Sequence, residues 1–447
     1  MGYKCLLIST NQVVTPYPVY PLGVAHLVGA LEAGGHQAVH YDILTHGGYE
    51  GLKTVIAREQ PDLIGFSIRN LDTVDSTLPD SFVHDVVEIV RFVRQQSATT
   101  PIVVGGPAFS ILPEAIMDLL GADYGIVGEG EKVLPMLADR LLNNDPPTEK
   151  ILRAPVDENP WSTAIYEPKT VEHYLAHGGM LNIQTKRGCP YRCSYCSYPT
   201  LEGRRYRFRD PRAVAEDFIR VGRDHKAGYV FFTDSVFNDA KGHYLEVAEA
   251  LVKAGNTVPW SGYFRPQNMT AEGMALLKRA GLSAMEVGAD AASDRTLAGL
   301  QKDLTFDEVV AFNELAVAQE IPCAHFIIFG GPEEDYDTLA EGLANIEKLA
   351  SAVVFAFTGI RVLPGTKMHA RAIADGVMRP EQPLLEPFFY FSPGLEEKEL
   401  DRRLKEAWKG RFDRVYPSSV MQDRITHLHK KGHIGPMWDL LVRKGRR

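Results

Sequence analysis

The chain has 447 residues, of which 45% are hydrophobic and 23% charged, and its formal net charge is −9. These values are typical of a globular protein with two or three domains, and the acidic balance argues against nucleic-acid binding. The sequence contains no run of about 18 apolar residues, so no membrane-spanning helix is predicted. The five cysteines do not suggest a disulfide framework, so we expect a cytoplasmic protein.

Residues 1–142 alternate between short apolar runs and stretches with a helical period. Strands are predicted at 5–9, 38–41, 63–67, 102–104 and 124–127, and helices near 21–33, 50–59, 80–95, 113–120 and 130–142. This alternation predicts a doubly wound, Rossmann-like parallel sheet that is covered on both faces. Ligands of such sheets bind outside the carboxyl ends of the strands, where Ser67, Gly105 and Gly106 stand.

Two segments are expected to lie outside the main domains. Residues 143–180 are polar and rich in proline, which is typical of a linker. Residues 376–447 contain a charged amphipathic stretch, which predicts a mostly helical C-terminal region. Aromatic and aliphatic residues near the end of this range are expected to pack against the rest of the protein. The arginine-rich run at 204–212 is expected to be a solvated loop.

Three cysteines follow the next predicted strand, at 181–185. Cys189, Cys193 and Cys196 have the spacing C-x3-C-x2-C, and no other cysteine is near them in the sequence. Four-iron clusters are normally held by four thiolates, so three thiolates would leave one iron with an open coordination position. The alternatives are a zinc site completed by a histidine and three unrelated cysteines. Zinc motifs usually pair two C-x2-C-like halves, and a second half is missing here.

Strand and helix alternate again between 181 and 375. The predicted strands lie at 181–185, 229–233, 259–263, 284–288, 324–329 and 353–360. In βα barrels the chemistry gathers at the carboxyl ends of the strands, and four residues stand at these ends: Asp234, Asn238, Asp290 and Gly330. Helix capping explains the two aspartates and the asparagine equally well. His325 lies within an apolar strand and is expected to be a core histidine with its hydrogen bonds satisfied.

The cysteine spacing, with Tyr195 directly before the last cysteine, resembles the signature of the radical S-adenosylmethionine (SAM) enzymes. Six strand-and-helix units after such a loop resemble the (β/α)6 partial TIM barrel of that family. Three later stretches are similar to family motifs: GADAASDRTLAGLQKDLT (288–305), FIIFGGPEED (326–335) and RVLPGT (361–366). The first departs from the usual pattern, because Asp290 replaces a glutamate and Ala291 a serine.

This resemblance implies that the three cysteines, Cys189, Cys193 and Cys196, hold a 4Fe-4S cluster whose open iron binds SAM. Carried over residue by residue, it implies SAM contacts at Tyr195, Asp234, Asn238, Asp290 and Gly330.

The first domain resembles the cobalamin-binding module that precedes many radical SAM domains. Ser67, Gly105 and Gly106 match later parts of its pattern, which implies that they contact cobalamin. The best-known version has Asp-x-His-x-x-Gly after the first strand, and its histidine replaces the base beneath cobalt. Residues 11–23 contain no histidine, so the lower axial ligand is not assigned. The alternative is a dinucleotide-type fold without a cofactor, although the G-x-G-x-x-G fingerprint is absent.

The two resemblances together imply a cobalamin-dependent methyltransferase that acts on an unactivated carbon of a small-molecule or natural-product substrate, through a 5′-deoxyadenosyl radical and methylcobalamin. They also imply an external electron donor such as flavodoxin or ferredoxin. One alternative is a radical SAM cyclase, a rearrangement enzyme or a transferase of another SAM-derived group. A second alternative is a non-catalytic iron–sulfur redox sensor.

Overall fold

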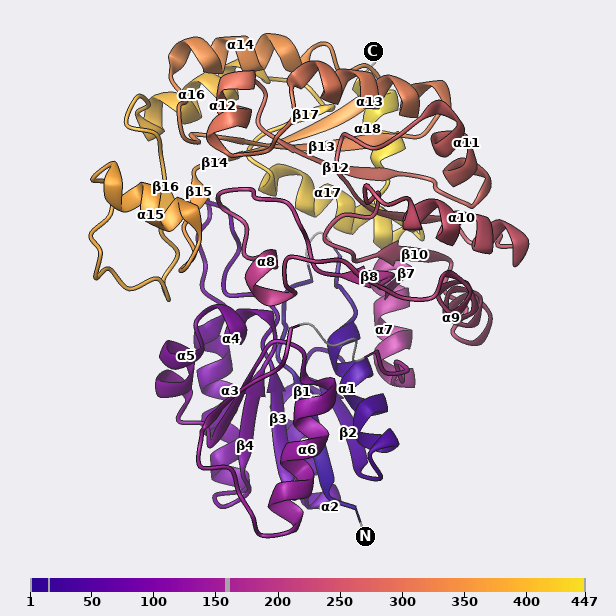
Figure 1. The fold of residues 1–447 in the computed structure, drawn as a ribbon, viewed down its shortest axis with the longest axis vertical. Helices are drawn as coiled ribbons and strands as arrows, with labels where there is room; N and C mark the ends of the chain where they lie inside the picture. The colour runs from indigo at the N-terminus through magenta and orange to yellow at the C-terminus, as the bar shows by residue number, and fades with distance from the viewer. Residues whose placement is uncertain (1, 15–16, 157–160, 446–447) are drawn as a thin grey trace.

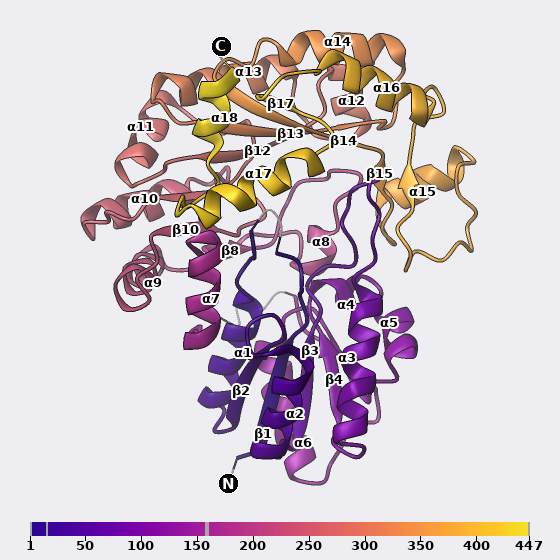
Figure 2. The ribbon, with the colours of Figure 1, turned by 180° about the vertical axis from the view of Figure 1, so that it is seen from behind.

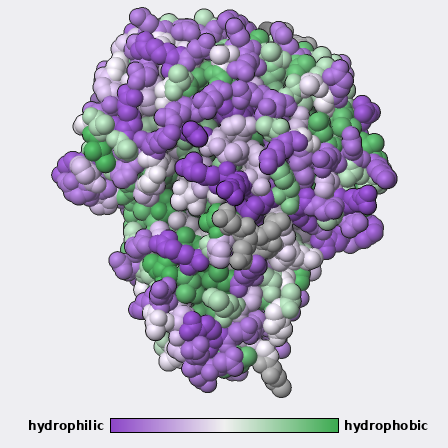
Figure 3. Space-filling model, viewed as in Figure 1, coloured by the Kyte–Doolittle hydropathy of each residue, from purple (hydrophilic) through white to green (hydrophobic). Residues whose placement is uncertain are grey.

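The two α/β domains of the chain lie one above the other in the computed structural model, which describes residues 2–14, 17–156 and 161–445 (Figure 1). The N-terminus is at the far end of the lower, first domain, and the C-terminus is at the top of the second. Across the described ranges, no helix is long and apolar enough to cross a membrane. Figure 3 shows hydrophilic residues over most of the second domain on this side, whereas hydrophobic residues gather on the first.

The first domain is built on a six-stranded parallel sheet with the order β2-β1-β3-β4-β5-β6. The strands are β1 (Lys4–Ser9), β2 (Gln37–Asp42), β3 (Leu63–Ser67), β4 (Ile102–Gly105), β5 (Tyr124–Val127) and β6 (Ile151–Arg153). Helices α1 (Leu22–Ala33) and α6 (Gly130–Leu142) cover one face, and α2 (Gly48–Glu59), α3 (Val83–Gln96), α4 (Pro107–Ile111) and α5 (Pro113–Leu120) cover the other.

Side-chain alternation explains why this sheet has helices on both faces. In β1, Leu6 and Ile8 belong to one core cluster, whereas Cys5 and Leu7 belong to the other. A strand that is buried on both faces reads as a continuous apolar run, which is the pattern of residues 5–8. The predicted doubly wound sheet is therefore confirmed.

The range 143–180 contains ordered elements. Strand β6 extends the first sheet beside β5. Helix α7 (Pro168–Gly178) begins after Glu167, whose carboxylate accepts hydrogen bonds from the backbone N–H groups of Lys169 and Thr170. A three-residue strand is too short to give a sequence period, so the sheet was predicted with only five strands.

The second domain is a partial barrel with the strand order β17-β14-β13-β12-β11-β10-β7. The strands are β7 (Met180–Ile183), β10 (Tyr229–Phe232), β11 (Trp260–Phe264), β12 (Met285–Asp290), β13 (Cys323–Phe329), β14 (Ala352–Thr358) and β17 (Arg414–Val415). The helices between or after them are α9 (Pro211–Asp224), α10 (His243–Lys253), α11 (Ala271–Arg279), α12 (Asp294–Gly299), α13 (Phe306–Ala318), α14 (Tyr336–Ile346), α15 (Lys367–Ala374) and α16 (Glu397–Ala407).

The six predicted barrel strands are confirmed, and β17 adds a seventh that pairs in parallel with β14. Two short antiparallel ribbons complete the domain: β8 (Lys186–Arg187) with β9 (Arg207–Phe208), and β15 (Ile360–Arg361) with β16 (Phe389–Tyr390). The single-turn helix α8 (Tyr198–Leu201) follows the cysteines.

The end of the chain closes the open side of the barrel. Helices α17 (Ser419–Lys430) and α18 (Trp438–Gly445) cross the concave face of the strands in Figure 2. Trp438 and Leu441 pack there with Ala324, Val353 and Phe355 from β13 and β14. The C-terminal residues therefore fill part of the barrel interior and leave the rest to face the first domain.

Candidate active site

The cysteine loop follows β7 and β8 at the carboxyl end of the barrel. Cys189 is buried, and Cys193 and Cys196 are partly buried. The Cys189 backbone N–H donates to Gly203 O at 3.0 Å, which fixes the start of the loop. Burial, with a contribution from the nearby Cys193 thiol, raises the pKa of Cys189 and raises that of Cys196 to about 12.

These thiols fit an iron–sulfur cluster. They are close enough to disfavour one another's ionisation, and cationic iron would relieve both that repulsion and the cost of burial. Within the described part of the chain, no three His, Cys, Asp or Glu side chains converge as a single-ion site requires. A four-iron cluster does not require such convergence, because each thiolate binds a different iron. Cys5 and Cys323 are buried in two other core clusters, on β1 and β13.

Two of the residues predicted to bind SAM meet each other. The Tyr195 hydroxyl donates a hydrogen bond to the Asp290 carboxylate, which also forms a salt bridge with Lys302. The Lys302 ammonium donates to Gly288 O at 3.0 Å, so it is held at the carboxyl end of β12. Lys302 was not predicted as a site residue, although it lies within the stretch 288–305 that resembles a family motif.

Asp234 and Asn238 are fully buried, and their side chains bond to the protein itself. Asp234 Oδ1 accepts from the Thr185 backbone N–H at 2.7 Å, and Oδ2 accepts from the Lys186 ammonium at 3.1 Å. Asn238 Nδ2 donates to Arg265 O at 2.8 Å. Both side chains therefore tie neighbouring strand ends together, and their contact with SAM stays a prediction.

Gly330 lies at the end of β13 with a φ of 92°, in the left-handed region that favours glycine. Its backbone N–H donates to Glu334 Oε2 at 2.6 Å, and that of Gly331 donates to the same atom at 3.0 Å. Burial raises the pKa of Glu334 to about 7, while these two hydrogen bonds oppose the rise. Gly330 is itself buried, and its carbonyl accepts a hydrogen bond from the Ser392 backbone N–H at 2.9 Å. Both of its backbone polar groups are therefore bonded within the protein, and its contact with SAM stays a prediction.

A cavity of about 390 Å³ lies between the domains, at the carboxyl ends of β1, β3, β4 and β5. Ser67, Gly105 and Gly106 all line it, so the structure brings the three predicted cobalamin residues together. A Cβ atom on Gly106 would stand 2.5 Å from Ile68 O, and its φ is 99°. Gly65, Gly128 and Gly130 also line the wall. A wall of backbone without side chains fits a large, flat cofactor such as cobalamin.

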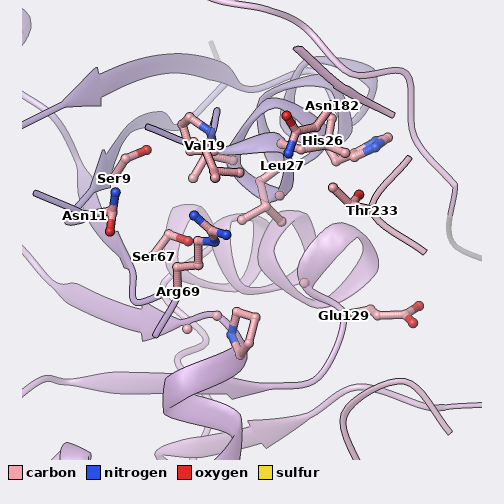
Figure 4. A pocket seen from close by; sticks show the side chains of 18 of the residues that line it. Ser9, Asn11, Val19, His26, Leu27, Ser67, Arg69, Glu129, Asn182 and Thr233 are labelled. Carbon is pink, nitrogen blue, oxygen red and sulfur yellow. The ribbon is translucent and has the colours of Figure 1, made fainter. Parts of the chain in front are cut away.

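Two cavity residues were not singled out in the sequence. The Arg69 side chain projects into the space beside Leu27 and Ser67 (Figure 4). His26 also lines the cavity, and its Nδ1 bonds Ser162 O at 2.8 Å. Burial, with Arg187 nearby, lowers the pKa of His26 to about 3, so its ring is neutral at pH 7. Neither residue forms part of a local motif, and no sequence signal marked them.

The barrel supplies the opposite wall of the same cavity. Met180 and Asn182 from β7, Phe231 from β10 and Tyr263 from β11 line it, together with Thr233 directly after β10. Figure 4 shows Asn182 and Thr233 on the side away from Ser9, Asn11 and Ser67. Ligands at the strand ends of both domains can therefore share one space.

Buried charge pairs close one side of the cavity. Arg187 Nη2 lies 2.6 Å from Glu131 Oε1, and Arg187 Nη1 lies 3.2 Å from Glu129 Oε2. Arg207 also pairs with Glu129, and Arg209 pairs with Asp217. The run at 204–212 was expected to be a solvated loop, but two of its arginines are held in largely buried salt bridges.

Comparisons with known proteins match both domains. A family model of the B12 binding domain matches residues 9–138, and one of the Radical SAM superfamily matches residues 183–344. The first range contains Ser67, Gly105 and Gly106, and the second contains the three cysteines. The chain is 26% identical to Tryptophan 2-C-methyltransferase of Streptomyces laurentii, in an alignment that covers 83% of this chain and 75% of that protein.

Two solved structures share the whole architecture. The radical SAM methyltransferase TsrM from Kitasatospora setae, with cobalamin and a [4Fe-4S] cluster bound, aligns with 100% of this chain and 99% of its own at a TM-score of 0.84 and 24% identity. The cobalamin-dependent SAM radical enzyme OxsB aligns with 99% of this chain and 70% of its own at a TM-score of 0.73 and 14% identity.

Proposed function

Because the chain belongs to the cobalamin-binding radical SAM enzymes, we propose that it methylates an unactivated carbon of a small-molecule substrate. The observation that carries the proposal is the single cavity whose two walls come from the strand ends of both domains. The enzyme uses a 4Fe-4S cluster, SAM and cobalamin. When bound, cobalamin supplies a carrier for the methyl group, and the cluster with SAM supplies one-electron chemistry.

Different residues would bind the cluster and cobalamin. Cys189, Cys193 and Cys196 would hold the cluster. The glycine-rich edge around Gly105 and Gly106 would admit the cobalamin ring, with Ser67 at its rim.

The SAM contacts are proposed for the cysteine loop and the carboxyl ends of the barrel strands. Tyr195 from the cysteine loop and Asp290 from the end of β12 would face SAM directly, and Gly330 directly after β13 would line the same site. Asp234 and Asn238 are proposed as further SAM contacts, and their bonds to Thr185 and Arg265 would also hold the neighbouring strand ends in place.

The contact between the domains would limit the water that reaches the cavity. Most of its exposed lining is apolar, from residues such as Leu27, Phe66 and Phe231. Exclusion of water protects reactive species from side reactions. We also propose an external electron donor such as flavodoxin or ferredoxin, because reductive cleavage of SAM consumes one electron that the substrate does not supply.

Product mass and nucleoside stoichiometry test the function. Anaerobic turnover with a strong reductant should give a product heavier by one CH2 unit, and tryptophan is the first substrate to try because a relative is named for it. Each methylation should consume two SAM molecules, one released as S-adenosylhomocysteine and one as 5′-deoxyadenosine with methionine. Abortive cleavage without substrate is measured in parallel and subtracted.

The Cys193→Ala variant is the matched control. It should stop the formation of 5′-deoxyadenosine and leave S-adenosylhomocysteine, because methyl transfer to cobalamin does not need the cluster. A product with no added mass, formed together with 5′-deoxyadenosine but without S-adenosylhomocysteine, would indicate cyclisation or rearrangement and not methylation.

A further inference from the structure

One carboxyl group stands inside the barrel with an oxygen that has no partner. Glu286 lies on β12 with 4% of its surface exposed, and its Oε1 makes no hydrogen bond to any residue that the structure describes. Its neighbours Met285 and Val287 pack in the core cluster under the outer helices, whereas Ala284 packs in the cluster inside the barrel. Because side chains alternate along a strand, Glu286 points into the barrel interior.

Glu286 borders the cavity between the domains. Its pairing partner on β11 is Tyr263, which lines that cavity. Tyr17, from the long loop after β1, lines it too, and a hydrogen bond from the Tyr17 hydroxyl lowers the pKa of the Glu286 carboxyl. The Glu286 carboxyl and the Tyr17 hydroxyl therefore lie together at the barrel end of the cavity.

Among the described side chains, none supplies a cation that acts on the Glu286 carboxyl. Burial raises the pKa of its carboxyl to about 8, and the Tyr17 hydroxyl opposes the rise. The titratable groups that face it are Tyr17, Tyr229 and Tyr263. Beyond them, the charge of Arg69 lowers the pKa of Tyr17 and of Tyr263, and the charge of Asp439 raises the pKa of Tyr229. A buried carboxyl without a charged partner is costly, and a ligand can supply what the fold does not.

We propose that Glu286 recognises the substrate by binding an ammonium group attached to an aromatic or apolar body. The inference rests on the proposed function, because it takes this cavity to be the substrate site. Phe231, Tyr17 and Tyr263 offer the apolar and aromatic surface for the body. On binding, the O–H bond of the carboxyl breaks and its proton passes to solvent. The carboxylate then accepts a charge-assisted hydrogen bond from the ammonium. No electron transfer is involved.

Two probes of matched shape test the charge preference. Tryptamine carries an ammonium group, and 3-ethylindole has a nearly identical body without it. Calorimetry is run anaerobically on the protein loaded with its cluster and hydroxocobalamin, at pH 7 in buffers of different ionisation enthalpy. We expect tryptamine to bind about tenfold more tightly or better, and to release roughly one proton that 3-ethylindole does not release. Between pH 6 and pH 9 the dissociation constant of tryptamine should fall, because the carboxyl ionises without a cost at the higher pH.

Two variants separate this role from a structural one. Glu286→Gln should remove both the preference for tryptamine and the proton release. Asp42→Asn is the matched control, because Asp42 is also a buried carboxyl with a pKa raised by burial, to about 6, but its oxygens are bonded to Leu44, Thr45 and Tyr174. It should leave both readouts unchanged.

Equal affinity of the wild-type protein for the two probes, binding of neither probe, or a preference that survives in Glu286→Gln would overturn the proposal. The wild-type pH series decides the question even where the Gln variant does not fold. If tryptamine binds as expected but no substrate gains a methyl group, the recognition role stands and the proposed function fails.

Discussion

Arg361 and Asp72 form a buried salt bridge that joins the two domains. The Arg361 Nε atom lies 2.7 Å from Asp72 Oδ2, and the two side chains are only 3% and 2% exposed. The remaining guanidinium N–H groups donate to Val362 O and Leu384 O. Arg361 belongs to β15 of the second domain, whereas Asp72 follows β3 of the first. The pair therefore holds the loop after β3 against the barrel at the edge of the shared site.

Removal of one partner of this pair should destabilise the protein strongly. In Asp72→Ala the guanidinium stays buried without its counter-charge, which typically costs about 3–5 kcal/mol. We expect a lower urea midpoint, measured by tryptophan fluorescence. His84→Ala is the control, since its salt bridge with Glu386 also joins the domains but both side chains are more than half exposed, and such pairs contribute about 0–1 kcal/mol. Equal shifts of the urea midpoint in the two variants would show that the buried pair stabilises the protein no more than the exposed pair.

The cluster assignment predicts a spectroscopic loss. Alanine at Cys189, Cys193 or Cys196 should abolish the iron–sulfur absorption of the anaerobically reconstituted protein, because thiolate is the iron ligand. Cys5→Ala and Cys323→Ala should keep it, since both thiols are buried in cores away from the loop. A Cys323→Ala protein without a cluster, beside a Cys196→Ala protein that retains it, would refute the assignment.

The glycine-rich edge predicts a specific loss of cobalamin. In Gly106→Ala the new Cβ would stand 2.5 Å from Ile68 O, so the backbone at the carboxyl end of β4 must move. We expect at least a tenfold lower retention of hydroxocobalamin after gel filtration, which corresponds to about 1.4 kcal/mol. Gly35→Ala is the control, because Gly35 also has a positive φ, 81°, but a Cβ there would meet nothing within 4 Å. Equal retention by the two variants would argue against a cofactor at this edge.

The Asp290 carboxylate predicts a defect in SAM binding. Asp290→Asn removes the charge that Lys302 and Tyr195 share, and leaves the buried ammonium of Lys302 with weaker partners. We expect about a tenfold weaker affinity for SAM by equilibrium dialysis, with the cluster absorption retained. Asp303→Asn, an exposed site one residue after Lys302, should bind SAM normally. Loss of the cluster together with SAM binding would instead assign Asp290 a structural role.

The sequence predicted what depends on local pattern. Strands such as β1 and β13 are runs of consecutive apolar residues, and the cysteine spacing is itself a local motif. The short strands β6 and β17 have three and two residues, too few for a period. Glu286 looks like an ordinary polar position in the stretch Ala284–Gly288. Its meaning depends on the strand beside it and on a loop from the other domain, which no local pattern encodes.

His325 predicts how stability depends on pH. It is fully buried on β13, as the sequence predicted, and its Nε2 bonds Asn313 Oδ1 at 3.0 Å. The expectation that all its hydrogen bonds are satisfied is wrong, because Nδ1 has no partner among the described residues. Burial, with Arg414 nearby, lowers its pKa to about 3, whereas an unfolded chain has a histidine pKa of about 6.5. Below pH 6.5 the unfolded state therefore binds one more proton than the folded state. Stability should fall as the pH drops from 6.5 towards 3, and His325 should contribute no pH dependence above 6.5.

The measurement is a series of urea unfolding curves between pH 4 and pH 8. His325 alone should add a slope of at most about 1.4 kcal/mol per pH unit below pH 6.5. His325→Gln keeps an N–H donor for Asn313 but cannot titrate, so its stability should fall less steeply with acid than that of the wild type. His84→Gln is the exposed control and should leave the slope close to that of the wild type. If the His325→Gln and wild-type curves remained parallel below pH 6.5, His325 would not be the buried neutral group that the structure describes.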